Sequence, residues 1–220
     1  MDPVDAPPPL ADLADPALFL DFDGTLVALA EAPDSVAVTP ELLPLLDRLA
    51  AMLAGRLAIL TGRALDDLDR HLAAPHLVAA GSHGLELRRG AAPAAPPEPP
   101  RGLAEARAAL AAFAAGEPGL LVEDKPAGVA LHYRLSPHRE EEAVALAQNL
   151  AARTGLFVQR GKMVVELRPS GADKGDALRA LMGEPPFAGA RPVFVGDDLT
   201  DEDGFRAATA LGGFGIIVGP

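Results

Sequence analysis

The sequence predicts an α/β protein in which a parallel sheet is flanked by helices and carries a smaller, inserted α+β subdomain. Three observations support this prediction. In the first part of the chain, short apolar runs alternate with segments of helical periodicity, and the joints between them are short, which is typical of a parallel sheet covered by helices. From about residue 85 the chain becomes strand-rich, with strands that follow one another directly. Near residue 169 the first pattern returns.

The predicted core is built from apolar strands that end in polar residues or glycine. Its strands are expected at Ala17–Leu20, Leu57–Leu60, Leu77–Ala80, Pro192–Gly196 and 215–218. Its helices are expected at Pro40–Leu53, Ala64–Leu72 and Asp173–Met182, where apolar residues recur at helical spacing. We therefore assign residues 17–86 and 169–220 to the core, and residues 1–16, rich in proline and aspartate, to a loose N-terminal tail.

The inserted subdomain is assigned to residues 87–168. It begins with a proline- and alanine-rich stretch, Ala91–Pro100, which favours an extended loop. Helices are expected at Leu103–Ala115 and Arg139–Thr154. Strands are expected at Leu120–Lys125, Gly128–Arg134, Leu156–Arg160 and Lys162–Arg168, and the last two form a hairpin that turns at Gly161.

Composition excludes several classes of protein. The chain has 220 residues, no cysteine, and a formal net charge of −12. A disulfide framework and a thiolate metal site are therefore excluded, and the acidic balance disfavours nucleic acid as a partner. No apolar run approaches the roughly 18 residues that cross a bilayer, and the first residues do not resemble a secretory signal. We expect a cytoplasmic enzyme.

Charged and hydroxyl side chains follow the predicted core strands. Asp21 and Asp23 follow the first strand, Thr61 the second and Asp197 the fourth, while Lys174 opens a helix. Ligands of open α/β sheets bind beyond the carboxyl ends of the strands, so these groups should converge on one site. Carboxylates bind Mg²⁺, and an ammonium and a hydroxyl suit phosphate oxygens. The pattern therefore indicates phosphoryl chemistry with Mg²⁺ as cofactor.

The spacing of the first two aspartates suggests separate roles. Residues i and i+2 of an extended segment point to the same side, so Asp21 could attack phosphorus while Asp23 gives a proton to the departing oxygen. An aspartate approaching a phosphate dianion meets a repulsion of about 4 kcal/mol per charge pair at about 4 Å and an effective dielectric near 20. Neighbouring cations are therefore required.

Four ordered motifs, Asp-Phe-Asp-Gly-Thr-Leu, Leu-Thr-Gly-Arg, Asp-Lys-Gly and Gly-Asp-Asp-Leu-Thr-Asp-Glu-Asp, resemble those of the haloacid dehalogenase (HAD) superfamily of phosphatases. The resemblance implies a Rossmann-like core with Asp21 as nucleophile and Asp23 as general acid and base. It further implies that the carboxylates of Asp21 and Asp197 and the backbone carbonyl of Asp23 bind Mg²⁺, and that Thr61, Gly62 and Lys174 bind the phosphoryl group. Asp198 and Asp201 would support the metal loop.

The last of these motifs continues as Gly-Asp-Asp-Leu-Thr-Asp-Glu-Asp-Gly-Phe. This longer form, together with Gly-Ser-His-Gly at 81–84 and Val-Glu-Asp-Lys at 122–125, is similar to trehalose-6-phosphate phosphatases. So are His-Tyr-Arg at 132–134 and Val-Glu-Leu-Arg-Pro at 165–169. In that family the insert is a cap over the active site, and a Glu, Lys, Glu set grips the sugar hydroxyls. The matching positions are Glu123, Lys125 and Glu166, and the resemblance adds His83, His132 and Arg134 as expected substrate contacts. Arg63 is included among the substrate-binding residues, with a surface or cap-contacting position as the alternative.

The cap strands carry this pattern independently of the resemblance. Glu123 and Lys125 lie two apart and so share one face of a strand, while the alternate positions are mostly apolar. Such a polar face is often merely solvated, but its mixture of carboxylates and cations suits a polyhydroxyl ligand. We expect a sugar phosphate as the small-molecule partner, no nucleic acid or membrane partner, and a monomer. The alternatives are a phosphatase for another sugar or polyol phosphate, a phosphomutase, and a non-catalytic binding domain.

Overall fold

The computed structural model describes residues 7–9, 12–30, 35–90 and 98–219. Its main sheet has the strand order β10-β9-β1-β2-β3-β4. The first five strands in this order are parallel, and β4 runs antiparallel to β3. These strands are β1 (Pro16–Leu20), β2 (Leu57–Leu60), β3 (Val78–Gly81), β4 (Glu86–Arg88), β9 (Arg191–Gly196) and β10 (Phe214–Ile217).

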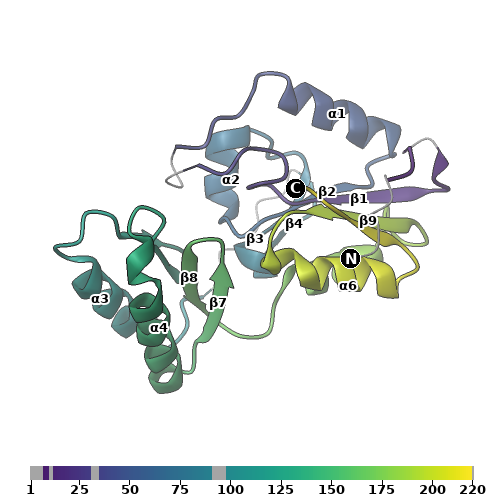
Figure 1. Cartoon of the computed structure of the whole chain (residues 1–220). Helices are drawn as coiled ribbons and strands as arrows, with labels where there is room; N and C mark the ends of the chain where they lie inside the picture. Colours follow the sequence, from purple (N-terminus) through teal and green to yellow (C-terminus); the bar gives the residue numbers. More distant parts are fainter. Residues whose placement is uncertain (1–6, 10–11, 31–34, 91–97, 220) are drawn as a thin grey trace, which may run out of the picture.

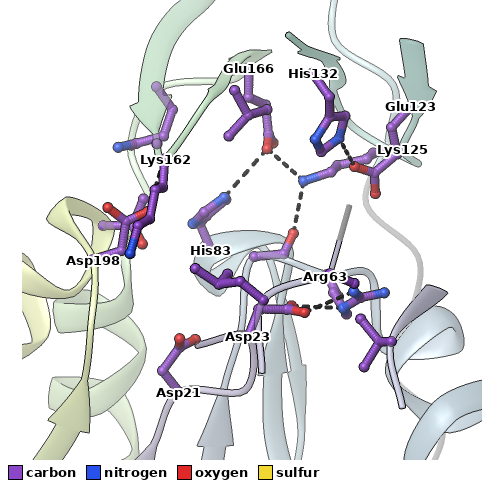
Figure 2. Close-up of a pocket in the computed structure, with 18 of the residues that line it drawn as sticks. Asp21, Asp23, Arg63, His83, Glu123, Lys125, His132, Lys162, Glu166 and Asp198 are labelled. Carbon is purple, nitrogen blue, oxygen red and sulfur yellow. Dashed lines mark hydrogen bonds and ion pairs between the residues drawn. The ribbon is translucent and has the colours of Figure 1, made fainter. Parts of the chain in front are cut away.

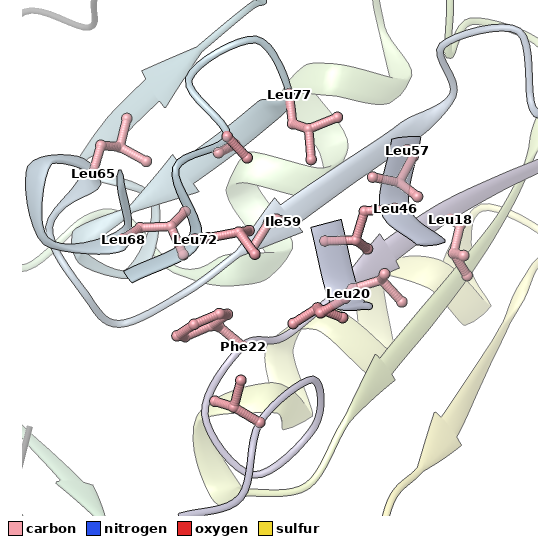
Figure 3. Packing of buried hydrophobic residues seen from close by; sticks show 14 of the residues in the cluster. Leu18, Leu20, Phe22, Leu46, Leu57, Ile59, Leu65, Leu68, Leu72 and Leu77 are labelled. Carbon is pink, nitrogen blue, oxygen red and sulfur yellow. The ribbon is translucent and has the colours of Figure 1, made fainter. Parts of the chain in front are cut away.

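Helices cover both faces of this sheet (Figure 1). One face packs on α1 (Leu42–Met52) and α2 (Leu65–Leu72), and Figure 3 shows the leucines and Phe22 that fill this layer. The other face packs on α5 (Lys174–Met182) and α6 (Glu202–Ala210). Because helices cover both faces of the sheet, β1 and β2 are wholly buried. This burial on both faces explains why their sequences are continuous apolar runs.

The inserted segment forms a second sheet with its own core. The strand order of this sheet is β5-β6-β8-β7, and each pair of neighbouring strands is antiparallel. The strands are β5 (Leu121–Asp124), β6 (Val129–His132), β7 (Phe157–Gly161) and β8 (Val164–Arg168). Helices α3 (Leu103–Ala114) and α4 (Glu140–Thr154) pack on one face (Figure 1). Val129, Leu131, Tyr133, Val165 and Leu167 are buried in this layer. The opposite face of the cap sheet bears the polar side chains.

Short 3₁₀ helices complete the chain at η3 (Ser82–Gly84), η4 (Pro137–Arg139) and η5 (Leu199–Asp201). None of the helices in the described ranges combines the length and the apolar character needed to cross a membrane.

The structure confirms the predicted α/β class and corrects three details. Strand β1 begins at Pro16, inside the expected tail, although residues 1–6 and 10–11 lie outside the described part of the chain. Strand β4 reaches Arg88 and belongs to the core sheet, so the predicted boundary after residue 86 cuts through a core strand. Helix α6 was not expected, because its start lies in the acidic cluster. Most of the predicted loop Ala91–Pro100 also lies outside the described residues.

Candidate active site

The carboxyl end of the core sheet faces the polar face of the cap sheet across a pocket (Figure 2). Most of the predicted site residues line it. These are Asp21, Asp23, Gly62, Arg63, His83, Glu123, Lys125, His132, Arg134, Glu166, Lys174 and Asp198. Thr61, Asp197 and Asp201 do not line it. Thr61 contacts Arg63 and Asp201 contacts Lys174, both of which line the pocket, and Asp197 contacts Asp201.

The floor of the pocket is a buried group of three carboxylates and one ammonium. Lys174, at the first turn of α5, donates to Oδ1 of Asp21 and to Oδ1 of Asp201, each at 2.6 Å. Asp21, Asp197 and Asp201 each offer a carboxylate oxygen, and these oxygens lie within 4.8 Å of one another. Three negative charges and one positive charge leave a net charge of −2, which a divalent cation would neutralise.

The pKa values of this group reflect the same excess of negative charge. Burial raises the pKa of Asp21 to about 7, and the attraction of Lys174 offsets this only in part. Burial, together with the charges of Asp201 and Asp198, also raises the pKa of Asp197. Burial by itself would lower the pKa of Lys174, but Asp21 and Asp201 outweigh it and raise that pKa. The carboxylates therefore lack positive charge, and the donor set of oxygens fits Mg²⁺.

Asp201 is occupied in fixing the loop after β9. Its side chain is fully buried, and its Oδ2 accepts hydrogen bonds from the backbone N–H of Asp197 at 2.9 Å and of Asp198 at 3.0 Å. Its Oδ1 accepts from Lys174. Asp21 and Asp197 would therefore hold the metal, while Asp201 orients the loop that carries Asp197. The supporting role that the resemblance implies for Asp201 at a bound metal stays a prediction.

Asp23 lies differently from the prediction that it points to the same side as Asp21. Its carboxylate turns toward Arg63 (Figure 2), whose Nε and Nη2 donate to its two oxygens at 2.7 and 2.8 Å. Asp21 instead accepts a hydrogen bond from Lys174. The chain bends at Phe22 rather than continuing as a strand, so the alternation of an extended segment does not apply. The metal group accordingly joins Asp21 to Asp197 and Asp201, without the Asp23 carboxylate.

The loop after β2 supplies the wall of the pocket. The hydroxyl oxygen of buried Thr61 accepts a hydrogen bond from the Arg63 N–H at 3.1 Å. Gly62 faces the ring of His83, and a Cβ on this glycine would lie 2.7 Å from Cε1 of that ring. The backbone oxygen of Gly62 also accepts a hydrogen bond from Lys125 of the cap at 3.0 Å.

The cap closes the pocket with a network of charges. Lys125 Nζ lies 2.6 Å from Glu166 Oε2, and His83 Nε2 lies 3.4 Å from the same oxygen. Burial would raise the pKa of Glu166, but Lys125 and His83 lower it well below its usual range. Burial lowers the pKa of His83, partly against the attraction of Glu166. Beside this network, His132 contacts Glu123 at 2.8 Å.

Sequence reasoning missed part of the lining, namely Leu29, Ala30, Val36, Gln159, Gly161, Lys162, Val164 and Thr200. Gln159 and Gly161 alternate along β7, and Val164 precedes Glu166 by two positions, so strand periodicity could have indicated them. Leu29, Ala30 and Val36 lie outside any helix or strand and carry no periodic signal.

Comparison with known proteins decides the family. The family model described as trehalose-phosphatase matches residues 19–218, which is nearly the whole chain. The chain belongs to the trehalose-phosphatase family. A probable trehalose-phosphate phosphatase of Sinorhizobium fredii is 46% identical over 95% of this chain and 80% of its own length. The trehalose-6-phosphate phosphatase of Escherichia coli is 40% identical over 92% of this chain and 77% of its own length.

Solved structures agree with this assignment. The crystal structure of a trehalose-6-phosphate phosphatase related protein has a TM-score of 0.77 and 28% identity, and the match covers 92% of this trehalose-phosphatase family member and 86% of that chain. A sucrose-phosphatase from Synechocystis, 19% identical with a TM-score of 0.51, shares the fold. The HAD-type core with its inserted subdomain is therefore confirmed.

Proposed function

We propose that this protein is a Mg²⁺-dependent phosphatase that hydrolyses trehalose 6-phosphate to trehalose and phosphate. The observation that carries the proposal is the buried group of Asp21, Lys174, Asp197 and Asp201 beneath a cap whose polar face closes the same pocket. The names of the relatives supply the substrate, and the mixed charges of Glu123, Lys125 and Glu166 suit its hydroxyl groups.

The reaction proceeds in two displacements at phosphorus. The Asp21 carboxylate attacks phosphorus and forms an aspartyl-phosphate, and the bond to the sugar oxygen breaks. Asp23 gives its proton to that oxygen, which leaves as the hydroxyl of trehalose. Asp23, now a carboxylate, takes a proton from the water that attacks the aspartyl-phosphate, and inorganic phosphate and the Asp21 carboxylate are released.

The surrounding residues reduce the electrostatic repulsion between the Asp21 carboxylate and the phosphoryl group. Lys174 neutralises part of the charge where the phosphoryl group meets Asp21. Mg²⁺ held by Asp21 and Asp197, with the Asp23 backbone carbonyl as the resemblance implies, would offset the remaining negative charge. The cap excludes bulk water while the acyl phosphate exists. All of these residues come from one chain, so we expect a catalytically complete monomer.

Phosphate release tests the substrate and the metal. We expect release from trehalose 6-phosphate to exceed that from glucose 6-phosphate or sucrose 6-phosphate, and a chelator to abolish it until Mg²⁺ is restored. A preference for another sugar phosphate would overturn the substrate assignment. Unchanged rates of phosphate release in the presence of chelator would overturn the proposed dependence on Mg²⁺.

A substitution of the nucleophile tests the covalent route. Asp21→Asn should lower turnover by about four orders of magnitude or more, as is typical when a nucleophile is removed. Asp176→Asn changes an exposed aspartate of α5 and should leave turnover unchanged. Substantial turnover by Asp21→Asn would contradict the aspartyl-phosphate.

A further inference from the structure

A buried arginine connects the pocket to a carboxylate outside it. Besides its two hydrogen bonds to Asp23, Arg63 donates from Nη1 to Oδ2 of Asp67 at 2.6 Å. Asp67 lies in the first turn of α2, and it does not line the pocket. A guanidinium is planar and rigid, so the direction of its fork toward Asp23 depends on what holds its remaining nitrogen.

The arrangement leaves Arg63 little freedom. The Arg63 side chain is 8% exposed and that of Asp67 is 14% exposed. The Cζ atom of Arg63 lies 5.7 Å from the centroid of the Phe22 ring. The Arg63 backbone is held in turn by the hydrogen bond to Thr61. Hydrogen bonds between charged groups at such low exposure are stronger than those of a surface ion pair.

We propose that Asp67 is a positioning residue for proton transfer at Asp23 and acts through Arg63. The inference rests on the proposed function, in which Asp23 delivers a proton to the departing sugar oxygen. Both oxygens of Asp23 accept from Arg63. A shift of the Arg63 fork therefore moves the Asp23 side chain away from its present position. By holding Arg63, Asp67 keeps the Asp23 carboxylate on the side of the pocket where Arg63 lies.

The proposal predicts an effect that depends on the leaving group. Trehalose leaves as an alkoxide that needs a proton, whereas 4-nitrophenolate leaves from 4-nitrophenyl phosphate without one. A displaced Asp23 therefore slows the first reaction and spares the second. Loss of folding or of metal binding would slow both reactions alike.

The test is Asp67→Asn, which preserves shape and removes the charge. We expect kcat for trehalose 6-phosphate to fall about tenfold with KM within about threefold, because misplacement of a proton donor affects the transition state more than binding. The rate with 4-nitrophenyl phosphate should change by less than about twofold. In an Asp23→Asn background the same substitution should have no further effect. Asp67→Glu, which keeps the charge at a shifted position, should give a smaller loss of the same kind.

Two controls separate this role from others. Asp66→Asn removes the same charge from the exposed neighbouring position of the helix and should leave both rates unchanged. Asp67 also contacts Arg70 at 3.1 Å, so Arg70→Gln shows whether that contact matters. Equal losses with both substrates, no loss with either, or the same pattern from Arg70→Gln would overturn the proposal. The wild-type rate on trehalose 6-phosphate tests the proposed function separately.

Discussion

Two glycines bring the charged residues of the site within reach of one another. Gly24 has a φ of +90°, and a Cβ at this position would lie 2.1 Å from Oδ2 of Asp197. Gly62 leaves room for the His83 ring in the same way. The loops after β1 and β2 can therefore approach their partners only where no side chain intervenes. This explains why glycine follows the polar residue in both motifs.

The substitution Gly62→Ala tests this close approach. The added Cβ would press on the His83 ring and move it away from Glu166, so we expect a loss of about 1–3 kcal/mol in the free energy of unfolding. We also expect a raised KM for trehalose 6-phosphate. Urea denaturation and steady-state kinetics measure the two effects. Gly183→Ala at the end of α5 is the matched control, because its nearest contact would be 3.4 Å. Equal behaviour of the two variants would contradict this explanation.

At this scale the sequence predicts residue types better than their pairings. Asp21, Lys174 and Asp197 could be expected to meet, because strand ends and helix starts of an α/β sheet converge. The pairing of Arg63 with Asp23 could not, because it depends on the bend at Phe22, which an extended segment would not have. Arg63 was expected to contact substrate, and that remains a prediction beside the ion pairs that the structure shows.

Among the elements, helix α5 has the clearest link between sequence and catalysis. Its N-cap, Asp173, accepts a hydrogen bond from the Asp176 N–H at 2.7 Å, and Lys174 is the first residue of the helix. A lysine at this end opposes the helix dipole. The contacts with Asp21 and Asp201 compensate for that position. The N-cap residue Asp173 therefore fixes the start of the helix that carries the Lys174 ammonium.

We therefore expect Asp173→Ala to lower the free energy of unfolding by about 1 kcal/mol, the usual contribution of an N-cap. Asp173→Ser should restore most of it, because serine also caps. Chemical denaturation of the two variants measures this difference. If alanine and serine proved equally destabilising, the side-chain cap would not be the cause.

Elements with a strong apolar pattern were predicted to within a few residues, and the failures have physical causes. Helix α6 begins at Glu202, within a run of acids that suggested a loop. Acids at a helix start are favourable, but the apolar positions that would mark its buried face are largely glycine and alanine. Strand β4 is only three residues long, so its alternation could not show which sheet it joins.

Across the whole molecule, the side chains proposed to hold the sugar also join the cap to the core. Lys125 of the cap donates to the Gly62 oxygen, and Glu166 of the cap contacts His83. These two contacts occupy donors and acceptors that sugar hydroxyls would otherwise use. A further contact between cap and core joins Asp198 to the Lys162 N–H at 3.2 Å. Substrate binding must therefore exchange some contacts between cap and core for contacts with the ligand, which couples opening of the cap to sugar recognition.

The variant Lys125→Met tests this coupling, because methionine preserves the apolar stem and removes the ammonium. Loss of a hydrogen bond to a charged group typically costs about 1.5–3 kcal/mol, so the KM for trehalose 6-phosphate should rise at least about tenfold. 4-Nitrophenyl phosphate has no sugar to grip, and its turnover should change by less than about threefold. Arg153→Gln, at an exposed cation of α4 paired with Glu105, is the control and should behave as wild type. A KM that stays unchanged in Lys125→Met would show that the cap closes without taking part in recognition, since the buried lysine would then serve only its partners Glu166 and Gly62.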